Sequence, residues 1–337
     1  MLGRHRRNNH GLSSQYELRV ANEGVVRAVG LAQFGGPDVL QLVDLPDPHA
    51  GPSQLVIRVH AAAVNPTDTL LRNGARAERF KGIPPPYVPG MDAAGVLEEI
   101  GEGVTTELRT GDHVMAIVVP DGSYGAYSEL IAVPAESVVR VPAGATDVQA
   151  ATLPMNGLTA RLALDLLELD PGQTLAVTGA AGAVGGYVIQ LAKTEGLKVI
   201  ADASEADTQL VESLGADVVV RRGREFSRTV REAIPEGVDG LVDAALLNGL
   251  VVPAVRDRGR IATVRGYVED AERGVTFYPV LVRSYSQERA KLDRLRQQVE
   301  DGVITLRVAR AMPAERAADA HRMLEAGGVR GRLVLEF

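Results

Sequence analysis

The chain has 337 residues, a formal net charge of −7 and no cysteine. This length favours two domains over one core, and the absence of cysteine excludes disulfides, iron–sulfur clusters, thiolate-bound zinc and cysteine nucleophiles. The acidic balance argues against nucleic acid as the main partner, and no apolar run reaches membrane-spanning length. We therefore expect a globular protein that binds neither nucleic acid nor a membrane.

Residues 1–25 differ from the rest of the chain. Arg4, Arg6 and Arg7 lie among polar residues that show no periodic pattern. A secretory signal peptide would need an apolar stretch after this basic start, and the sequence has none there. We expect a disordered extension on a cytoplasmic protein.

The part from 26 to 147 is rich in short β-strands. Apolar residues alternate with polar ones in short segments separated by glycine and proline, which is typical of strands joined by turns. The expected strands are 26–31, 40–45, 54–61, 94–100, 113–118 and 126–133. This pattern predicts a compact, barrel-like β domain.

From residue 148 to 280 strands alternate with helices, which predicts a parallel sheet covered on both faces. Beyond it we expect a helix at 287–301, a strand at 304–308, a helix at 313–326 and a strand at 331–335. The simplest assembly returns these last elements to the first domain. The predicted domains are therefore 26–147 with 281–337, and 148–280.

The stretch 174–193 predicts a strand, a tight turn and a helix. Glycines break the apolar strand, and Val184 and Val188 restart an apolar pattern at helical period. The free N–H groups at such a helix start bind a pyrophosphate, which small residues allow to approach. The predicted dinucleotide contacts are Gly179, Ala180, Ala181, Gly182, Ala183, Val184 and Gly185.

Several ordered motifs accompany this turn, at 64–68, 88–96, 111–114, 125–129, 153–160, 243–245 and 331–335. Together they resemble the medium-chain dehydrogenase/reductase superfamily, in its zinc-independent quinone oxidoreductase branch. The resemblance implies an α/β protein with a GroES-like β-rich catalytic domain and an inserted Rossmann domain with a doubly wound parallel sheet. It also implies a homodimer paired through the strand edge at 274–282.

Alcohol dehydrogenases of this superfamily hold a catalytic zinc, and by motif their ligands align with Asn65, Met91 and Met155. One amide and two thioethers make a poor zinc site, because zinc prefers thiolate, imidazole and carboxylate. We expect no metal, and no ligand cluster among His60, His113 and His321.

The cofactor is predicted from the end of the second Rossmann strand. An acidic residue usually binds the ribose of NAD there, whereas this chain has Ala203, which leaves room for a 2′-phosphate. The lysine that relatives often place in the next helix is Thr208 here. Ser204, Arg221 and Arg222 are the candidate phosphate ligands, unless the two arginines only form a solvated loop. NADPH is therefore favoured over NADH.

Further contacts follow from the resemblance. Thr159 matches a position that contacts the nicotinamide, with an ordinary helix-start role as the alternative, and Ala244 belongs to a motif beside the cofactor. Asn65 and Asp68 match positions around nicotinamide and substrate. Asn65 would donate to the substrate oxygen and Asp68 would orient it, although both are also common turn formers and helix caps.

The predicted chemistry is hydride transfer from NADPH, because the chain offers neither metal nor cysteine. Quinones and enones suit such a site, since their incoming charge spreads over a conjugated system. Some relatives carry a tyrosine that can donate a proton at the position of Leu70, and leucine excludes that role here. Tyr127 is expected to pack between the domains. Three hypotheses stay open: an NADPH-dependent quinone oxidoreductase, an enoyl or enone reductase, and a non-catalytic NADPH-binding protein.

Overall fold

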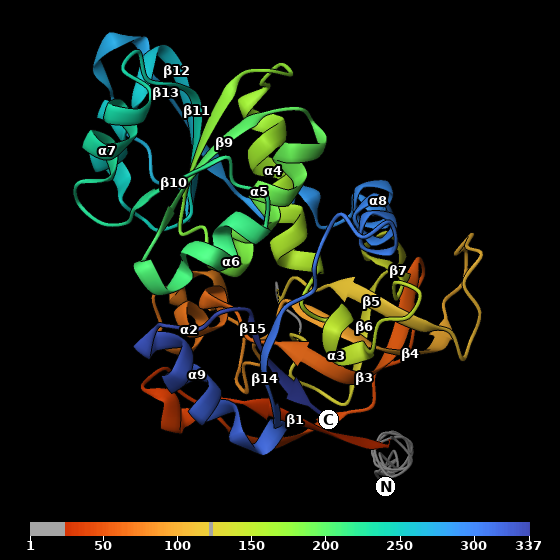
Figure 1. Cartoon of the computed structure of the whole chain (residues 1–337). Coiled ribbons are helices and arrows are strands. Elements are labelled where there is room, and N and C mark those ends of the chain that lie inside the picture. The colour runs from red at the N-terminus through yellow and green to blue at the C-terminus, as the bar shows by residue number, and fades with distance from the viewer. Residues whose placement is uncertain (1–23, 121–123) are drawn as a thin grey trace, which may run out of the picture.

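Two large sheets and a two-stranded ribbon organise residues 24–120 and 124–337, which this computed structural model describes (Figure 1). Most of the predicted N-terminal extension, residues 1–23, lies outside the described residues. No helix in the described ranges is long and apolar enough to cross a membrane.

The parallel-sheet lobe, at the top of Figure 1, is built on strands β8 to β13. All neighbouring strands run parallel, in the order β10-β9-β8-β11-β12-β13. Consecutive strands leave β8 in one direction and β11 in the other, so the order reverses between these two. Ligands of doubly wound sheets bind at such a reversal, beyond the carboxyl ends of the strands. The strands are β8 Thr174–Thr178, β9 Lys198–Ala203, β10 Val218–Arg221, β11 Val238–Asp243, β12 Val255–Val264 and β13 Thr276–Val280.

Helices cover both faces of this sheet, with α4, α5 and α6 on one side and α7 on the other (Figure 1). Their bounds are α4 Pro154–Leu167, α5 Ala183–Thr194, α6 Thr208–Ser213 and α7 Phe226–Ala233. A short 3₁₀ turn, η4 Glu205–Asp207, precedes α6. The predicted Rossmann arrangement is confirmed.

The mixed-sheet lobe, at the bottom of Figure 1, contains the first strands and the last ones. Its main sheet has the order β14-β15-β3-β4-β5-β7, with β6 paired to β3, and β1 and β2 form a separate ribbon. The blue elements at the end of the chain lie among the orange strands, as predicted (Figure 1). The strands are β1 Val25–Gly30, β2 Gln41–Pro46, β3 Gln54–Ala63, β4 Asp92–Ile100, β5 His113–Ile117, β6 Leu130–Pro134, β7 Val138–Arg140, β14 Val308–Pro313 and β15 Arg332–Glu336. The helices are α2 Pro66–Arg72, α3 Asp147–Ala150, α8 Arg289–Glu300 and α9 Ala317–Ala326.

The strand expected at 304–308 is wrong, because β14 begins only at Val308. The residues before it run along α5 instead. Gln190 Nε2 donates to Thr305 Oγ1 at 3.1 Å, and Arg307 reaches the carbonyls at the start of the helix. These contacts with the other lobe replace the ladder that a strand would form.

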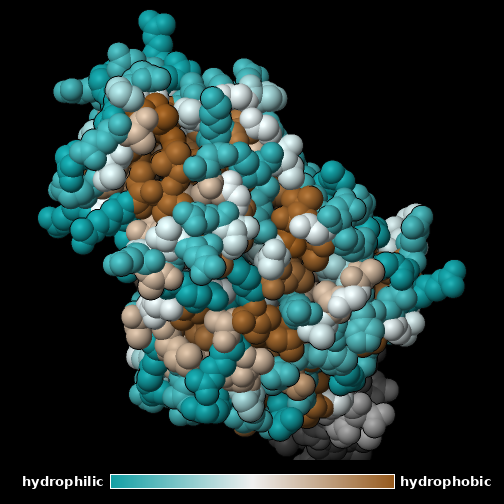
Figure 2. All heavy atoms as spheres, viewed as in Figure 1, coloured by the Kyte–Doolittle hydropathy of each residue, from teal (hydrophilic) through white to brown (hydrophobic). Residues whose placement is uncertain are grey.

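The core continues from one lobe into the other. One buried cluster joins Leu158 and Val177 of the parallel-sheet lobe to Met91 and Met115 of the mixed-sheet lobe. On the visible face, apolar residues reach the surface over the upper lobe and along the middle of the molecule, among hydrophilic ones (Figure 2). The lobes are thus packed through a shared apolar core.

Candidate functional site

The glycine turn joins β8 to α5 at the reversal of the strand order. Gly179 has a φ of +65°, a conformation that favours glycine, and Gly182 caps α5. A Cβ on Gly185 would lie 2.4 Å from the carbonyl oxygen of Gly179, so the helix and the turn approach too closely for any side chain. The first N–H groups of α5 lack intrahelical partners, which fits the predicted pyrophosphate site.

Two aspartates hold the strand ends around this turn. Asp202 of β9 is buried, and its Oδ1 accepts the N–H of Ala180 at 3.0 Å. Asp243 of β11 accepts the hydroxyl of Thr178 at 2.6 Å and the N–H of Asn248 at 2.7 Å. They fix the loops that carry the predicted contacts Ala180, Ala181 and Ala244.

A cavity of about 490 Å³ opens at the end of β9. Its lining contains Ala203 and the three candidate phosphate ligands Ser204, Arg221 and Arg222. The other lining residues are Glu205, Thr208, Val219 and Val220. Arg221 and Arg222 are exposed, and neither side chain forms a hydrogen bond or ion pair with another described residue. The structure therefore brings these residues together and leaves two guanidinium groups available.

Two further arginines come to this region from the mixed-sheet part of the chain, and the sequence predicted neither. Arg307 donates to the carbonyls of Ala181 at 3.1 Å and Gly182 at 2.6 Å. Gly186 makes room for it, since a Cβ there would lie 2.5 Å from Arg307 Nη2. Burial lowers the pKa of Arg307, but a guanidinium stays charged at neutral pH.

The second of these arginines is Arg330, whose Nη2 lies 2.7 Å from Asp207 Oδ2. The same carboxylate accepts the hydroxyl of Ser204 at 2.5 Å. Arg330 thus fixes η4 beside the cavity, and Ser204 is already bonded within the protein. An arginine 123 residues along the chain from its partner gives no local sequence signal.

Asn65 lies in a fully buried polar cluster with Asp92 and Arg332. Asn65 Nδ2 donates to Asp92 Oδ2 at 2.9 Å, and Arg332 Nη2 donates to Asn65 Oδ1 at 2.8 Å. Asp92 Oδ1 accepts the N–H of Met155 at 2.6 Å, which ties β4 to the start of α4. Burial raises the pKa of Asp92, and the guanidinium of Arg332 opposes that shift. Arg332 Nε is buried without a hydrogen-bond partner among the described residues.

Asp68 belongs to a second buried chain of side chains. It accepts the N–H of Asn65 at 2.8 Å and the hydroxyl of Tyr127 at 3.1 Å, and burial raises its pKa to about 7. Tyr127 also contacts Nε2 of His321 at 3.2 Å, and Nδ1 of His321 faces Arg72. Because arginine can only donate, His321 carries its proton on Nε2. Tyr127 is buried within the mixed-sheet core, so the prediction that it packs between the domains is wrong.

The pH dependence of stability should reveal His321. Burial, aided by Arg72, lowers its pKa to about 3. As the pH falls from 7 to 5, the unfolded chain binds a proton at this residue and the folded chain does not. The free energy of unfolding therefore decreases by about 2 kcal/mol over this range. Asp68 has the opposite sign, because its raised pKa makes the folded state bind the proton. Urea unfolding of wild type and His321→Gln at both pH values isolates the histidine, and equal losses in the two proteins would contradict its buried neutral state.

Thr159 lies buried on α4, and its hydroxyl donates to the carbonyl of Met155 at 2.6 Å. This is an ordinary bond within a helix, and the contact of Thr159 with the nicotinamide stays a prediction. The side chains of Asn65 and Asp68 are likewise bonded within the protein, so their direct contact with a substrate stays a prediction too.

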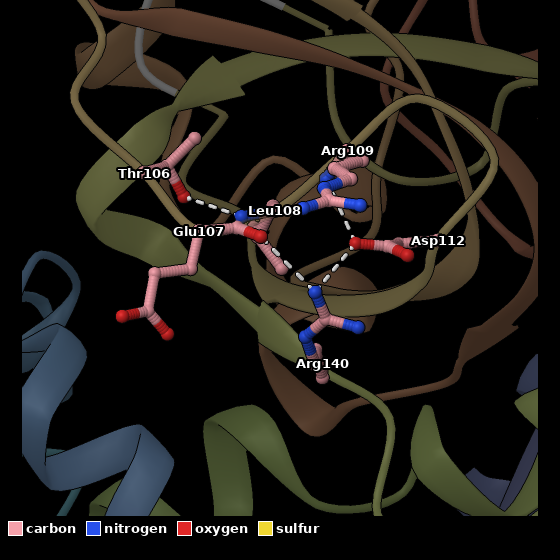
Figure 3. Close-up of a pocket in the computed structure, with 6 residues that line it drawn as sticks. All are labelled: Thr106, Glu107, Leu108, Arg109, Asp112 and Arg140. Atoms are coloured by element: carbon pink, nitrogen blue, oxygen red, sulfur yellow. Dashed lines mark hydrogen bonds and ion pairs between the residues drawn. The ribbon is translucent and has the colours of Figure 1, made fainter.

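Another cavity, of about 620 Å³, lies away from all these residues. Its polar groups bond one another: Arg140 reaches Asp112 at 2.8 Å and the carbonyl of Glu107 at 3.1 Å (Figure 3). It contains none of the predicted site residues. The cavity at the end of β9 is therefore the better candidate site.

The histidine prediction needs a correction. The structure places His60 and His113 around Asp147, with ligand atoms within 4.8 Å of one another. The sequence had placed neither histidine in a ligand cluster. Their separation along the chain hides the juxtaposition, because β3, β5 and α3 meet only in the folded protein.

Comparison with known proteins identifies the family of this chain. Residues 51–143 match the family Alcohol dehydrogenase GroES-like domain, and residues 214–335 match Zinc-binding dehydrogenase. The chain is 32% identical over 316 residues to NADPH-dependent alkenal/one oxidoreductase of Arabidopsis thaliana, covering 90% of this chain and 78% of that one. This protein is a member of the medium-chain dehydrogenase/reductase superfamily.

Further relatives support this membership. This chain is 29% identical over 331 residues to the quinone oxidoreductase of Sus scrofa, and the match covers 92% of this chain and 98% of that one. The quinone oxidoreductase of Coxiella burnetii superposes with a TM-score of 0.81 at 30% identity, covering 93% and 100% of the two chains. A mycobacterial protein solved with NADPH gives 0.81 at 28% identity, covering 92% and 100%. The chain is therefore an oxidoreductase of this superfamily, with a nicotinamide cofactor and a small-molecule substrate.

Proposed function

We propose that this protein is an NADPH-dependent reductase that transfers hydride to a quinone or a similar conjugated carbonyl compound. The observation that carries the cofactor part is the cavity at the end of β9. Ala203 places no charge there, and Arg221 and Arg222 supply two guanidinium groups with no bonded partner among the described residues. The 2′-phosphate of NADPH can accept charge-assisted hydrogen bonds from such groups. NADH has no 2′-phosphate and cannot form them.

The remaining cofactor contacts belong to the same proposal. The turn from Gly179 to Gly185 would hold the pyrophosphate at the start of α5. Ala244 lies directly beside this turn, since a Cβ on Gly179 would lie 3.1 Å from its carbonyl carbon. When bound, NADPH supplies the hydride, and this chain's residues fix its position relative to the acceptor.

A zinc-independent reaction is proposed from the chemistry of the donors. The positions that align with zinc ligands offer the amide of Asn65 and the thioethers of Met91 and Met155, a poor set for zinc. The amide oxygen already accepts from Arg332 at 2.8 Å, and this guanidinium would repel a metal cation there. These residues do not fit a catalytic zinc ion.

The roles of Asn65 and Asp68 also stay a proposal. Both residues lie at the start of α2, where the N–H of Asn65 donates to the carboxylate of Asp68. Donation by Asn65 to a substrate oxygen would require one of its present bonds, to Asp92 or to the carbonyl of Ala63, to open. An unpaired buried donor such as Arg332 Nε is costly, and a polar group of a bound ligand nearby would satisfy it.

Enone reduction is the second candidate function. Two relatives bear names of this chemistry, the Arabidopsis enzyme and 2-methylene-furan-3-one reductase of Solanum lycopersicum, which is 31% identical to this chain. Carbon protonation in an enone needs an acid, and Leu70 cannot supply one. Quinones need protons only on oxygen, so they remain the main proposal.

Deuterium transfer distinguishes the two acceptors. NADPH labelled at nicotinamide C4 should be consumed with a naphthoquinone, whereas reduction of an acyclic enone would place the label on its β-carbon. Turnover confined to enones would reverse the order of the two candidates. Tight NADPH binding without turnover of any conjugated carbonyl would favour the non-catalytic hypothesis.

The cytoplasmic location stays a prediction from the sequence.

We also propose that the protein is a homodimer. Strand β13 pairs with β12 and is the last strand of its sheet, so its outer edge is open among the described residues. Leu281 directly follows β13 and is 58% exposed, and Val268, in the loop between β12 and β13, is 55% exposed. Pairing of two such edges would satisfy backbone groups and cover these side chains. Light scattering should give twice the chain mass, and a monomer at micromolar concentration would contradict the proposal.

A further inference from the structure

Two imidazoles and one carboxylate meet on the surface of the mixed-sheet lobe. His60 Nδ1 lies 2.7 Å from Asp147 Oδ2, and His113 Nδ1 lies 2.9 Å from Asp147 Oδ1. The two imidazole rings stand edge to face, with centroids 6.0 Å apart. Both histidines therefore direct the same nitrogen at one carboxylate.

Three separate elements position these side chains. His60 is on β3, His113 begins β5, and Asp147 begins α3. The aspartate is nearly buried, with 12% of its side chain exposed, whereas His60 is 41% and His113 is 58% exposed. The carboxylate is thus fixed, and the imidazoles can adjust toward a ligand from solvent.

The arrangement matches the donors that borderline divalent metals prefer. Zinc binds imidazole nitrogen and carboxylate oxygen at about 2.0 to 2.2 Å. Tetrahedral geometry then separates ligand atoms by about 3.3 Å, so the present contacts would need to widen by about half an ångström. The exposed histidines allow that movement by rotation, and water can fill the fourth position.

We propose that His60, His113 and Asp147 form a Zn²⁺ site. It is distinct from the position of Asn65, Met91 and Met155, where Arg332 already donates a hydrogen bond to the amide oxygen of Asn65. Binding at the two Nδ1 atoms requires the tautomer of each imidazole that carries its proton on Nε2. The site would cross-link β3 and β5 to α3, the helix through which the chain passes toward α4 of the other lobe.

The experiment uses the full chain after chelator treatment and dialysis. Calorimetric titration with Zn²⁺ should give one ion per chain, and the ion should raise the melting temperature by about 2 to 5 °C. Mg²⁺ should have no effect, because it prefers oxygen ligands in octahedral geometry. Co²⁺ should give the absorption bands of a four-coordinate nitrogen and oxygen site.

The decisive comparison is between two variants. His60→Gln/His113→Gln should lose the bound ion, the thermal shift and the Co²⁺ bands. His49→Gln should keep all three, since His49 is exposed and its nearest carboxylate partner is Glu99 at 3.5 Å. Both variants retain His5 and His10, so an ion held there would survive in either. No saturable binding, or binding that persists in the double variant, would overturn the site.

Discussion

Replacing Arg332 by methionine is expected to destabilise the folded protein by about 3 to 5 kcal/mol, because removal of one partner leaves a buried charge uncompensated. Arg332 pairs with Asp92 at 3.1 Å and donates to Asn65, and both partners are completely buried. Methionine fills similar space without a donor. Urea unfolding, followed by circular dichroism, measures the loss.

Two further variants show whether charge causes this effect. Arg310→Met removes an exposed arginine from the adjacent strand β14 and should change stability by less than about 0.5 kcal/mol. Arg332→Met/Asp92→Asn removes both charges and keeps an oxygen for the N–H of Met155. It should therefore be more stable than Arg332→Met alone. A loss in the double variant equal to the sum of the single losses would show that the ion pair is not the cause.

The double variant Arg221→Ala/Arg222→Ala is expected to bind NADPH about 10 to 100 times more weakly, the effect of losing charge-assisted hydrogen bonds. NADH has no 2′-phosphate, so its affinity should change little. The chain contains no tryptophan, which leaves the fluorescence of the reduced nicotinamide free of energy transfer from that residue. Fluorescence titration with each cofactor measures the two affinities.

Arg224→Ala is the matched control for this prediction. Arg224 is exposed on the same loop but does not line the cavity at the end of β9. Its loss should reduce NADPH affinity much less than loss of the other two arginines, although all three lower the charge of the loop. Equal weakening of NADPH and NADH by Arg221→Ala/Arg222→Ala would place the arginines outside the phosphate site.

Local patterns in the sequence predicted the parts of the fold that depend on neighbouring residues. The glycine turn is fixed by Gly179, Gly182 and Gly185 within a few residues, and the structure forms the expected strand, turn and helix. Ala203 and Arg221 lie close together because β9 and β10 are adjacent parallel strands whose ends meet, while phosphate binding there stays a prediction.

Contacts between distant segments could not be predicted in this way. Arg332 and Asn65 are 267 residues apart, and neither motif shows that a guanidinium would meet the amide. The segment before β14 has the apolar alternation of a strand, but Arg307 and Thr305 bind to α5 instead. Tertiary contacts with the other lobe decided the conformation there, against the local preference.

The most direct test of the proposed function is steady-state oxidation of NADPH and NADH by the purified protein with one quinone as acceptor. We expect quinone reduction with a kcat/KM at least about tenfold higher for NADPH than for NADH, the ratio that one charge-assisted contact supplies. Equal use of NADH would contradict the phosphate site formed by Ala203, Arg221 and Arg222.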